Sequence, residues 1–148
     1  MKILVTGCAG FIGYHVCKKL IEINKYQVFG IDNINNYYDI KLKKKRLSLL
    51  NKSKKKFTFV KLDILNKKKL FQNFKTKKFD IVIHLAAQAG VRFSIDNPQS
   101  YVDSNLVGFF NVIDCSRLLN IKHFVFASTS SVYGDTKKFP INESAATD

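Results

Sequence analysis

Three glycines follow the first apolar run of the chain at a spacing of three residues. In ILVTGCAGFIGYH they are Gly7, Gly10 and Gly13, and an amphipathic stretch comes directly after them. A strand that turns into a helix over a bound pyrophosphate uses glycines for the tight turn, for close backbone approach and for helix–strand packing. The exposed N–H groups and the dipole of the helix start then attract phosphate. A purely structural turn explains the glycines taken alone, so the pattern needs a second feature beside it.

That second feature is an acidic residue about 20 residues further on, where a dinucleotide site requires one. It is Asp32, in VFGIDN, at the end of the second apolar run. A carboxylate there accepts hydrogen bonds from ribose hydroxyls and repels a 2′-phosphate. The two features together predict a dinucleotide site that prefers NAD to NADP.

Short apolar runs alternate with longer amphipathic stretches along the whole chain. We expect strands over 2–6, 27–31, 57–62, 80–85 and 123–128, and helices over 11–24, 40–52, 67–76 and 99–120. The last helix has a broad apolar face, made of Tyr101, Val102, Leu106, Phe109, Phe110, Val112, Ile113 and Leu118. Runs rich in Val, Ile and Phe are typical of parallel strands buried on both faces. The pattern predicts an α/β fold, a Rossmann-type doubly wound parallel sheet in one domain over 1–148.

The formal net charge of +14 offers a different function. Most of the lysines lie in the stretch 41–78, as an electrostatic footprint for nucleic acid would require. Arginine, which base readout and bidentate phosphate contacts favour, occurs at positions 46, 92 and 117. We therefore expect a solvated lysine-rich surface and no nucleic-acid partner, with 51–56 as a mobile loop.

Cysteine content and hydropathy limit the remaining classes. Cys8, Cys17 and Cys115 have no metal-ligand spacing, and we expect reduced thiols in the core and no metal site. No apolar run approaches the roughly 20 residues of a membrane span, and the start lacks the apolar region of a signal peptide. The sequence predicts a cytoplasmic protein without a membrane partner.

Four segments resemble the extended short-chain dehydrogenase/reductase superfamily, in its NAD-dependent nucleotide-sugar epimerase/dehydratase branch. They are TGCAGFIG, IDNINNYYDIKLKKKRL, HLAAQAGVRFSIDNPQSYVDSNLVGFFNVI and FASTSSVYG. Within that branch they are most similar to UDP-glucuronate 4-epimerases and related capsular nucleotide-sugar epimerases. The resemblance implies that NAD is the cofactor and a UDP-sugar is the substrate.

The resemblance also implies which residues surround NAD. Besides the three glycines and Asp32, they are Phe11, Ile12, Asn33, Asn35, Asn36, Asp63, Ile64, Leu85, Ala86, Ala87, Gln88 and Ser104. Most of these follow predicted strands, where ligands bind in open α/β sheets. Asp63 taken singly reads equally well as a helix cap.

The catalytic segment implied by the resemblance is STSSVYG. Thr129 matches the residue that hydrogen-bonds the reacting sugar hydroxyl, and Ser128 and Ser130 lie beside it as substrate contacts. Arg92 is a candidate cation for the substrate's carboxylate or phosphates. Tyr133 and Lys137 match Tyr-x-x-x-Lys literally, but in this family the catalytic pair lies on a later helix, so we reject them. His84 is expected to be a buried structural histidine.

The resemblance implies a 4-epimerase that oxidises C4 of UDP-glucuronate transiently and returns the hydride. We expect the sheet to stop before the family's last strands, its Tyr/Lys helix and its substrate subdomain, which would leave these 148 residues inactive alone. A full-length form would be a homodimer. Three alternatives stay open: a 4,6-dehydratase, disfavoured because serines stand at 130 and 131 where those enzymes carry an acid, a non-catalytic NAD-binding fragment, and a basic nucleic-acid binder.

Overall fold

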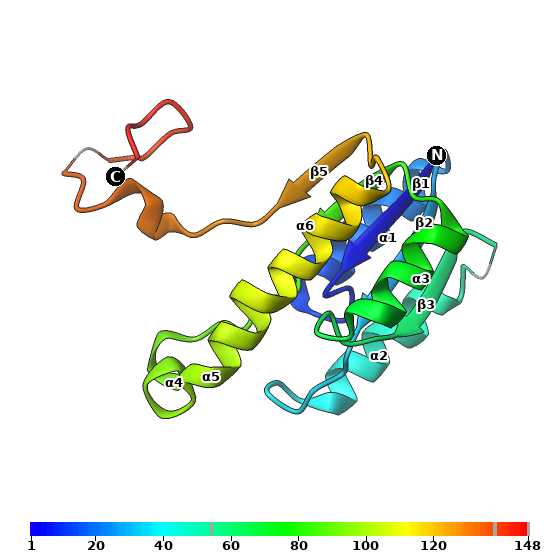
Figure 1. The fold of residues 1–148 in the computed structure, drawn as a ribbon, viewed down its shortest axis with the longest axis horizontal. Helices are drawn as coiled ribbons and strands as arrows, with labels where there is room; N and C mark the ends of the chain where they lie inside the picture. Colours follow the sequence, from blue (N-terminus) through cyan, green and yellow to red (C-terminus); the bar gives the residue numbers. More distant parts are fainter. Residues whose placement is uncertain (54, 138, 148) are drawn as a thin grey trace.

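Within the described residues, five parallel strands form one sheet in the order β3-β2-β1-β4-β5 (Figure 1). The strands are β1 (Lys2–Thr6), β2 (Gln27–Asp32), β3 (Phe57–Lys61), β4 (Ile81–His84) and β5 (His123–Phe126). The computed structural model describes residues 1–53, 55–137 and 139–147. The parallel sheet predicted from the apolar runs is confirmed, with strand ends within two residues of the expected ones.

The helices cover both faces of this sheet. They are α1 (Phe11–Ile23), α2 (Ile40–Asn51), α3 (Lys67–Lys77), α4 (Val91–Asp96), α5 (Pro98–Tyr101) and α6 (Phe109–Leu118), with a π-helical segment η1 (Val102–Gly108) and a 3₁₀ turn η2 (Ser130–Tyr133). Core contacts place α1 and α2 on one face and α3 and α6 on the other (Figure 1). The sheet is therefore doubly wound, as predicted.

Strand residues alternate between the two cores. Leu4 faces the core under α3 and α6, while its neighbours Ile3 and Val5 face the core under α1 and α2. Each such side chain is almost fully buried, and full burial contributes about 1.5–3 kcal/mol apiece. This explains why the strands read as continuous apolar runs.

The predicted helix over 99–120 is wrong in its details. The structure starts α5 at Pro98, which occupies the first turn, continues through the π-helical η1, and ends α6 at Leu118. The short α4 was missed because its six residues are too few to show helical periodicity.

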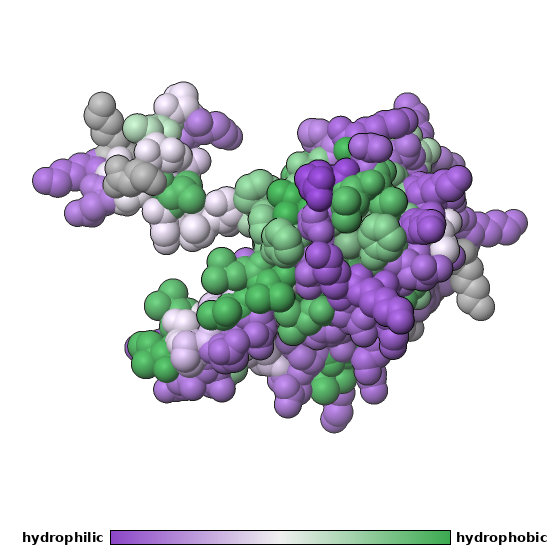
Figure 2. Space-filling model, in the orientation of Figure 1, coloured by the Kyte–Doolittle hydropathy of each residue, from purple (hydrophilic) through white to green (hydrophobic). Residues whose placement is uncertain are grey.

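The apolar face expected on that helix is also largely unburied. Val112 is fully buried, but Leu106 and Phe110 are 65% and 56% exposed. The side that meets the sheet contains small or polar residues instead, namely Asn111, Cys115 and Ser116. Figure 2 shows hydrophobic side chains on the outer surface in this part of the molecule.

The segment after β5 extends away from the sheet and its helices (Figure 1). Most of its described residues are exposed, including Phe139 at 77%. The 3₁₀ turn η2 ends at Tyr133 and is followed by Gly134 as its C-cap. None of the described residues of this segment belongs to the buried residues of the two cores.

The structure also bears on the cysteines, on membrane-spanning helices, on metal sites and on the loop predicted over 51–56. All three cysteines are buried and free, and burial raises the pKa of Cys17 to about 12. The described residues contain no helix long and apolar enough to cross a bilayer, and no cluster of side chains suited to hold a metal ion. Lys54, in the middle of the loop predicted over 51–56, lies outside the described residues.

Candidate dinucleotide site

A cleft of about 410 Å³ lies at the carboxyl ends of β1, β2 and β4. In the sheet, β2 and β3 lie on one side of β1, and β4 and β5 lie on the other. The strand order therefore reverses between β1 and β4, and the cleft lies at this switch point. Its lining consists of Gly7, Gly10, Phe11, Ile12, Gly13, Ile31, Asp32, Asn33, Asn35, Tyr38, Leu62, Asp63, Ile64, Leu85, Ala86, Ala87, Ala89, Ser104 and Ala127. The structure thus brings together most of the residues that the sequence predicted for the cofactor.

The three glycines have three different environments. Gly7 has φ +69°, and a Cβ there would lie 2.8 Å from the carbonyl oxygen of Leu85. A Cβ on Gly13 would collide with the carbonyl group of Gly7. At Gly10 the nearest atom would be the Gly7 oxygen at 3.1 Å, so a side chain there would extend mainly into the cleft. Gly7 and Gly13 shape the turn, and Gly10 keeps the cleft open.

The start of α1 is built to receive an anion. Gly10 is its N-cap and has no side-chain oxygen to satisfy the first N–H groups of the helix. Phe11, Ile12 and Gly13 carry those groups and line the cleft. The first turn also contains no acidic residue. A phosphate would supply the missing acceptors.

Asp32 holds the turn and the following loop together. Its Oδ2 accepts a hydrogen bond from the amide of Ala9 at 3.1 Å, and its Oδ1 accepts one from the amide of Ile34 at 2.9 Å. The carboxylate has about four acceptor sites, so it can still accept ribose hydroxyls. It is one of the residues that line the cleft.

Asp63 lines the cleft and does not cap α3. The N-cap of α3 is Asn66, whose side chain accepts from the amide of Lys69. Asp63 accepts from Asn33 Nδ2 at 3.0 Å and from the amide of Leu65 at 2.9 Å. The structure therefore joins the loops after β2 and β3 beside the cleft.

Thr6 fixes the backbone that follows β4. Its hydroxyl accepts from the amides of Leu85 and Ala86, both at 3.0 Å, and lies 2.8 Å from Nδ1 of His84. The hydroxyl hydrogen is then directed at Nδ1. Burial lowers the pKa of His84 to about 4, so the imidazole is neutral and accepts that hydrogen. His84 is buried and bonded to a core side chain, as expected for a structural histidine.

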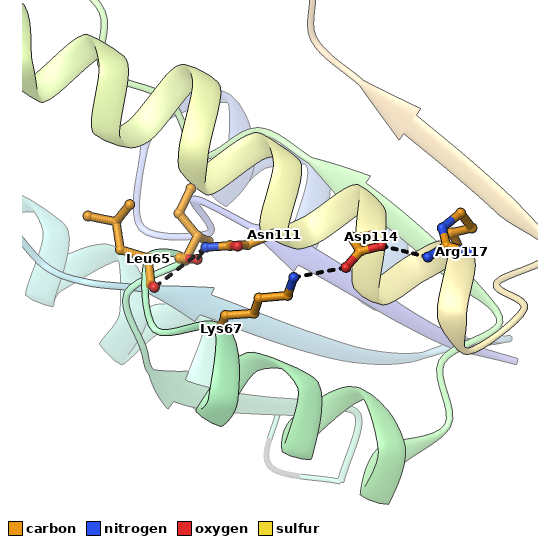
Figure 3. A network of polar contacts seen from close by, with 6 residues as sticks. Leu65, Lys67, Asn111, Asp114 and Arg117 are labelled. Atoms are coloured by element: carbon orange, nitrogen blue, oxygen red, sulfur yellow. Dashed lines mark hydrogen bonds and ion pairs between the residues drawn. The ribbon is translucent and has the colours of Figure 1, made fainter.

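The sequence did not identify the polar residues that bond to the backbone of the loops around the cleft. Asn105 pairs with the backbone of Gln88 through two hydrogen bonds of 2.8 and 3.0 Å. Asn111 donates to the carbonyl of Ile64 at 3.0 Å and more weakly to that of Leu65, and nearby Asp114 pairs with Lys67 and Arg117 (Figure 3). The only signal for these residues was an amide within an apolar helical stretch, since such an amide is buried only where it finds a partner.

Two cations of α2 approach the same region. The buried Lys43 donates to Asn35 twice, to its backbone oxygen at 3.0 Å and to its side-chain oxygen at 2.7 Å. Arg46 donates to the carbonyl of Ala9 at 3.2 Å and lies over the ring of Phe11. These two members of the lysine-rich stretch have structural partners.

Other predicted residues lie outside the lining of the cleft. Asn36 and Arg92 are exposed, and Gln88 is buried with its side chain bonded to Ala89. Ser128, Thr129 and Ser130 follow the lining residue Ala127 directly, on the segment that extends away from the sheet (Figure 1). The Thr129 side chain accepts from the amide of Ser131 and caps η2. A larger concavity, about 590 Å³, is formed within 133–146 and contains no predicted site residue.

Tyr133 and Lys137 do not share a helix. The 3₁₀ turn that carries Tyr133 ends at Gly134, where φ is +59°. The two side chains therefore lack the common helical face that a Tyr-x-x-x-Lys pair uses.

Comparison with known proteins shows the family of this chain. A family model described as GDP-mannose 4,6 dehydratase matches residues 4–148. The chain belongs to this family. It is the nucleotide-sugar epimerase/dehydratase branch of the short-chain dehydrogenases that the sequence segments resemble.

Two relatives illustrate what the chain is similar to. The chain is 49% identical to protein CapI of Staphylococcus aureus over 144 residues, covering 97% of this chain and 42% of CapI. It is 48% identical to a UDP-glucuronate 4-epimerase of Thermodesulfobacterium geofontis over 130 residues, covering 88% of this chain and 40% of that protein. The chain thus spans less than half the length of these relatives.

A solved structure has the same fold over these residues. UDP-glucuronic acid 4-epimerase from Bacillus cereus, in complex with UDP-glucuronic acid and NAD, superposes with a TM-score of 0.85 at 36% identity. The match covers 100% of this chain and 46% of that one. That protein therefore binds NAD on the same fold.

Proposed function

We propose that this chain is the NAD-binding part of a cytoplasmic nucleotide-sugar 4-epimerase whose substrate is UDP-glucuronate. The observation that carries the proposal is the cleft itself, which places the uncapped start of α1 next to Asp32 and Asp63. The similarity to proteins named UDP-glucuronate 4-epimerase supports the choice of substrate.

The residues present suit NAD. Gly10 leaves room for a pyrophosphate at the helix start, and Asp32 offers acceptors to the adenosine ribose. When bound, NAD supplies a hydride acceptor that takes hydrogen from C4 of the sugar and can return it to the other face. In the proposed enzyme, Thr129 holds the reacting hydroxyl, Ser128 and Ser130 contact the substrate, and Arg92 faces an anionic group of it.

We expect these 148 residues alone to bind NAD without turning over substrate. Thr129 follows the cleft-lining Ala127 by two residues but lies on the extended segment, outside the cleft. In this proposal, NAD binding belongs to these 148 residues, and epimerisation belongs to a protein of the relatives' full length.

The test of the epimerase is product analysis with the full-length gene product and UDP-glucuronate. We expect UDP-galacturonate, identified by chromatography and NMR, without net consumption of NAD. A product lighter by one water, formed from a hexose nucleotide, would indicate the 4,6-dehydratase that the family model's description suggests. Ser130 and Ser131 argue against that alternative, because they provide no acid for the elimination.

We also propose that the full-length protein is a homodimer that pairs through η1 and α6. Val102, Leu106 and Phe110 repeat at helical spacing and are 42%, 65% and 56% exposed. An apolar stripe of this kind is typical of an interaction surface. Light scattering should give twice the monomer mass, and Phe110→Lys should halve it.

The lysine-rich surface is proposed to be solvated rather than a nucleic-acid site. Nucleic-acid binding would depend steeply on salt. A fluorescent oligonucleotide titrated at low and physiological salt should show no saturable binding at the higher concentration.

A further inference from the structure

An aromatic cluster joins two of the chain segments that line the cleft. The segment after β2 contributes Asn33, Asn35 and Tyr38 to the lining, and the segment after β4 contributes Ala86, Ala87 and Ala89. Tyr37 and Gly90 come directly next to these lining residues in sequence. Contact between Tyr37 and the chain around Gly90 therefore links one side of the cleft to the other.

The contact is close and belongs to a cluster of four rings. The ring of Tyr37 lies 4.8 Å from that of Phe93 on α4, measured between centroids, at an interplanar angle of 49°. It also lies 4.6 Å from the ring of Tyr38, edge to face. Phe93 in turn lies 6.4 Å from Tyr101. Aromatic pairs within this range attract each other beyond the effect of buried area.

Gly90 makes room for this contact. Its φ is +99°, a conformation that L side chains rarely adopt, and a Cβ there would collide with the Tyr37 hydroxyl. Desolvation, together with the neighbouring Tyr38 and Tyr101, raises the pKa of Tyr37.

Each side of the contact is anchored independently. On the β2 side, the ammonium of Lys43 holds Asn35 by two hydrogen bonds. On the β4 side, the Tyr101 hydroxyl donates to the carbonyls of Ala89 and Gly90, and Asn105 holds Gln88. The rings thus connect two segments that are each held by hydrogen bonds of their own, and we expect a ligand lying between them to leave more slowly while they are connected.

We propose that Tyr37, Phe93 and Gly90 form a clasp across the NAD cleft that sets the rate of NAD release. The inference rests on the proposed binding of NAD. An epimerase regenerates its cofactor in each cycle, so slow release would keep the enzyme loaded between turnovers. Tyr37 is a positioning residue here, because it acts through the segments that line the cleft.

The experiment measures two quantities on the same protein: the equilibrium affinity for NAD, by calorimetry, and the dissociation rate, by stopped-flow displacement with excess ADP-ribose. Tyr37→Leu and Phe93→Leu should each speed release about three- to tenfold, and the double variant should add little, because either change breaks the same contact. Phe71→Leu, on α3 and outside the lining of the cleft, is the matched control and should leave the rate unchanged.

Gly90 provides a second, sharper arm. Gly90→Ala should speed release, and Tyr37→Phe introduced with it should restore part of the slow rate, because it removes the hydroxyl that the new methyl group meets. Strain at Gly90 alone would give no such restoration. Normal NAD affinity of the unmodified chain with unchanged release in Tyr37→Leu would overturn the clasp. Absence of NAD binding to the unmodified chain would instead overturn the proposed function.

Discussion

The cleft and the segment after β5 carry the two halves of the predicted chemistry, but the chain organises them very differently. The cleft is built from strand ends, and its loops are held by hydrogen bonds between the backbone and the side chains of Thr6, Asp32, Asn105 and Asn111. The segment with Thr129 is exposed and bonds mainly within its own turn. The predicted cofactor site is thus held by contacts inside these residues, whereas the placement of Thr129, the predicted catalytic residue, does not follow from them.

The largest expected effect concerns the packing of the cleft region. Gly13→Val should destabilise the fold by about 3 kcal/mol or more, because its side chain would enter the space of the Gly7 carbonyl group. Urea denaturation measures the loss. Lys19→Ala, on the exposed side of the same helix, should change stability by less than about 0.5 kcal/mol. Equal stability of the two variants would show that the turn is not the rigid element described.

Gly10→Val separates binding from folding. Its side chain would project into the cleft with one tight contact, at 3.1 Å from the Gly7 oxygen. We expect NAD affinity to fall by about 100-fold or more, which corresponds to about 2.7 kcal/mol, with cooperative unfolding retained. Calorimetric titration checks the affinity. Unchanged affinity would remove the glycine turn from the site.

Acidification should weaken the cleft region through His84. Its folded pKa of about 4 lies below the ordinary value of 6.5, so protons bind the unfolded chain more readily. The contribution of His84 to the free energy of unfolding is complete above pH 6.5 and is lost as the pH falls toward 4. Between pH 7 and 5, the free energy of unfolding should fall by about 2 kcal/mol. His84→Gln cannot titrate, so its stability should fall less over this range. Parallel pH profiles for the two proteins would contradict this role.

Asp32→Asn should narrow the preference for NAD over NADP. The substitution keeps the shape of the side chain but removes the charge that opposes a 2′-phosphate. We expect the ratio of the two affinities to fall by about tenfold, a change of about 1.4 kcal/mol. An unaltered ratio, measured by competition, would assign the preference to other residues.

Thr129→Val, in the segment after β5, is expected to have the smallest effect on NAD affinity. Since Thr129 lies outside the cleft, we expect the NAD affinity of these 148 residues to stay within about twofold of the original, which is less than 0.5 kcal/mol. A clear loss of affinity would mean that the segment after β5 folds onto the cleft in solution.

Much of this protein could be read from local patterns in the sequence. Gly7 and Asp32 identified the strand–turn–helix unit because their roles follow from backbone geometry within a short stretch of chain. The strands were found because a sheet covered on both faces needs continuous apolar runs. The stretch 99–120 was harder, since Val112 and Phe110 are both apolar, yet the first is buried and the second exposed.

Only the tertiary structure decided which distant residues meet. From the sequence, Asp63 could be either a helix cap or a residue of the cleft. In the structure it accepts a hydrogen bond from Asn33 and lines the cleft. Sequence gave no reason to connect Tyr37 with Gly90, or Asn105 with Gln88. Local sequence determines turns, periodicity and backbone freedom, because these depend on neighbouring residues. Contacts across the cleft depend on the order of strands in the sheet, which no local pattern in this chain specifies.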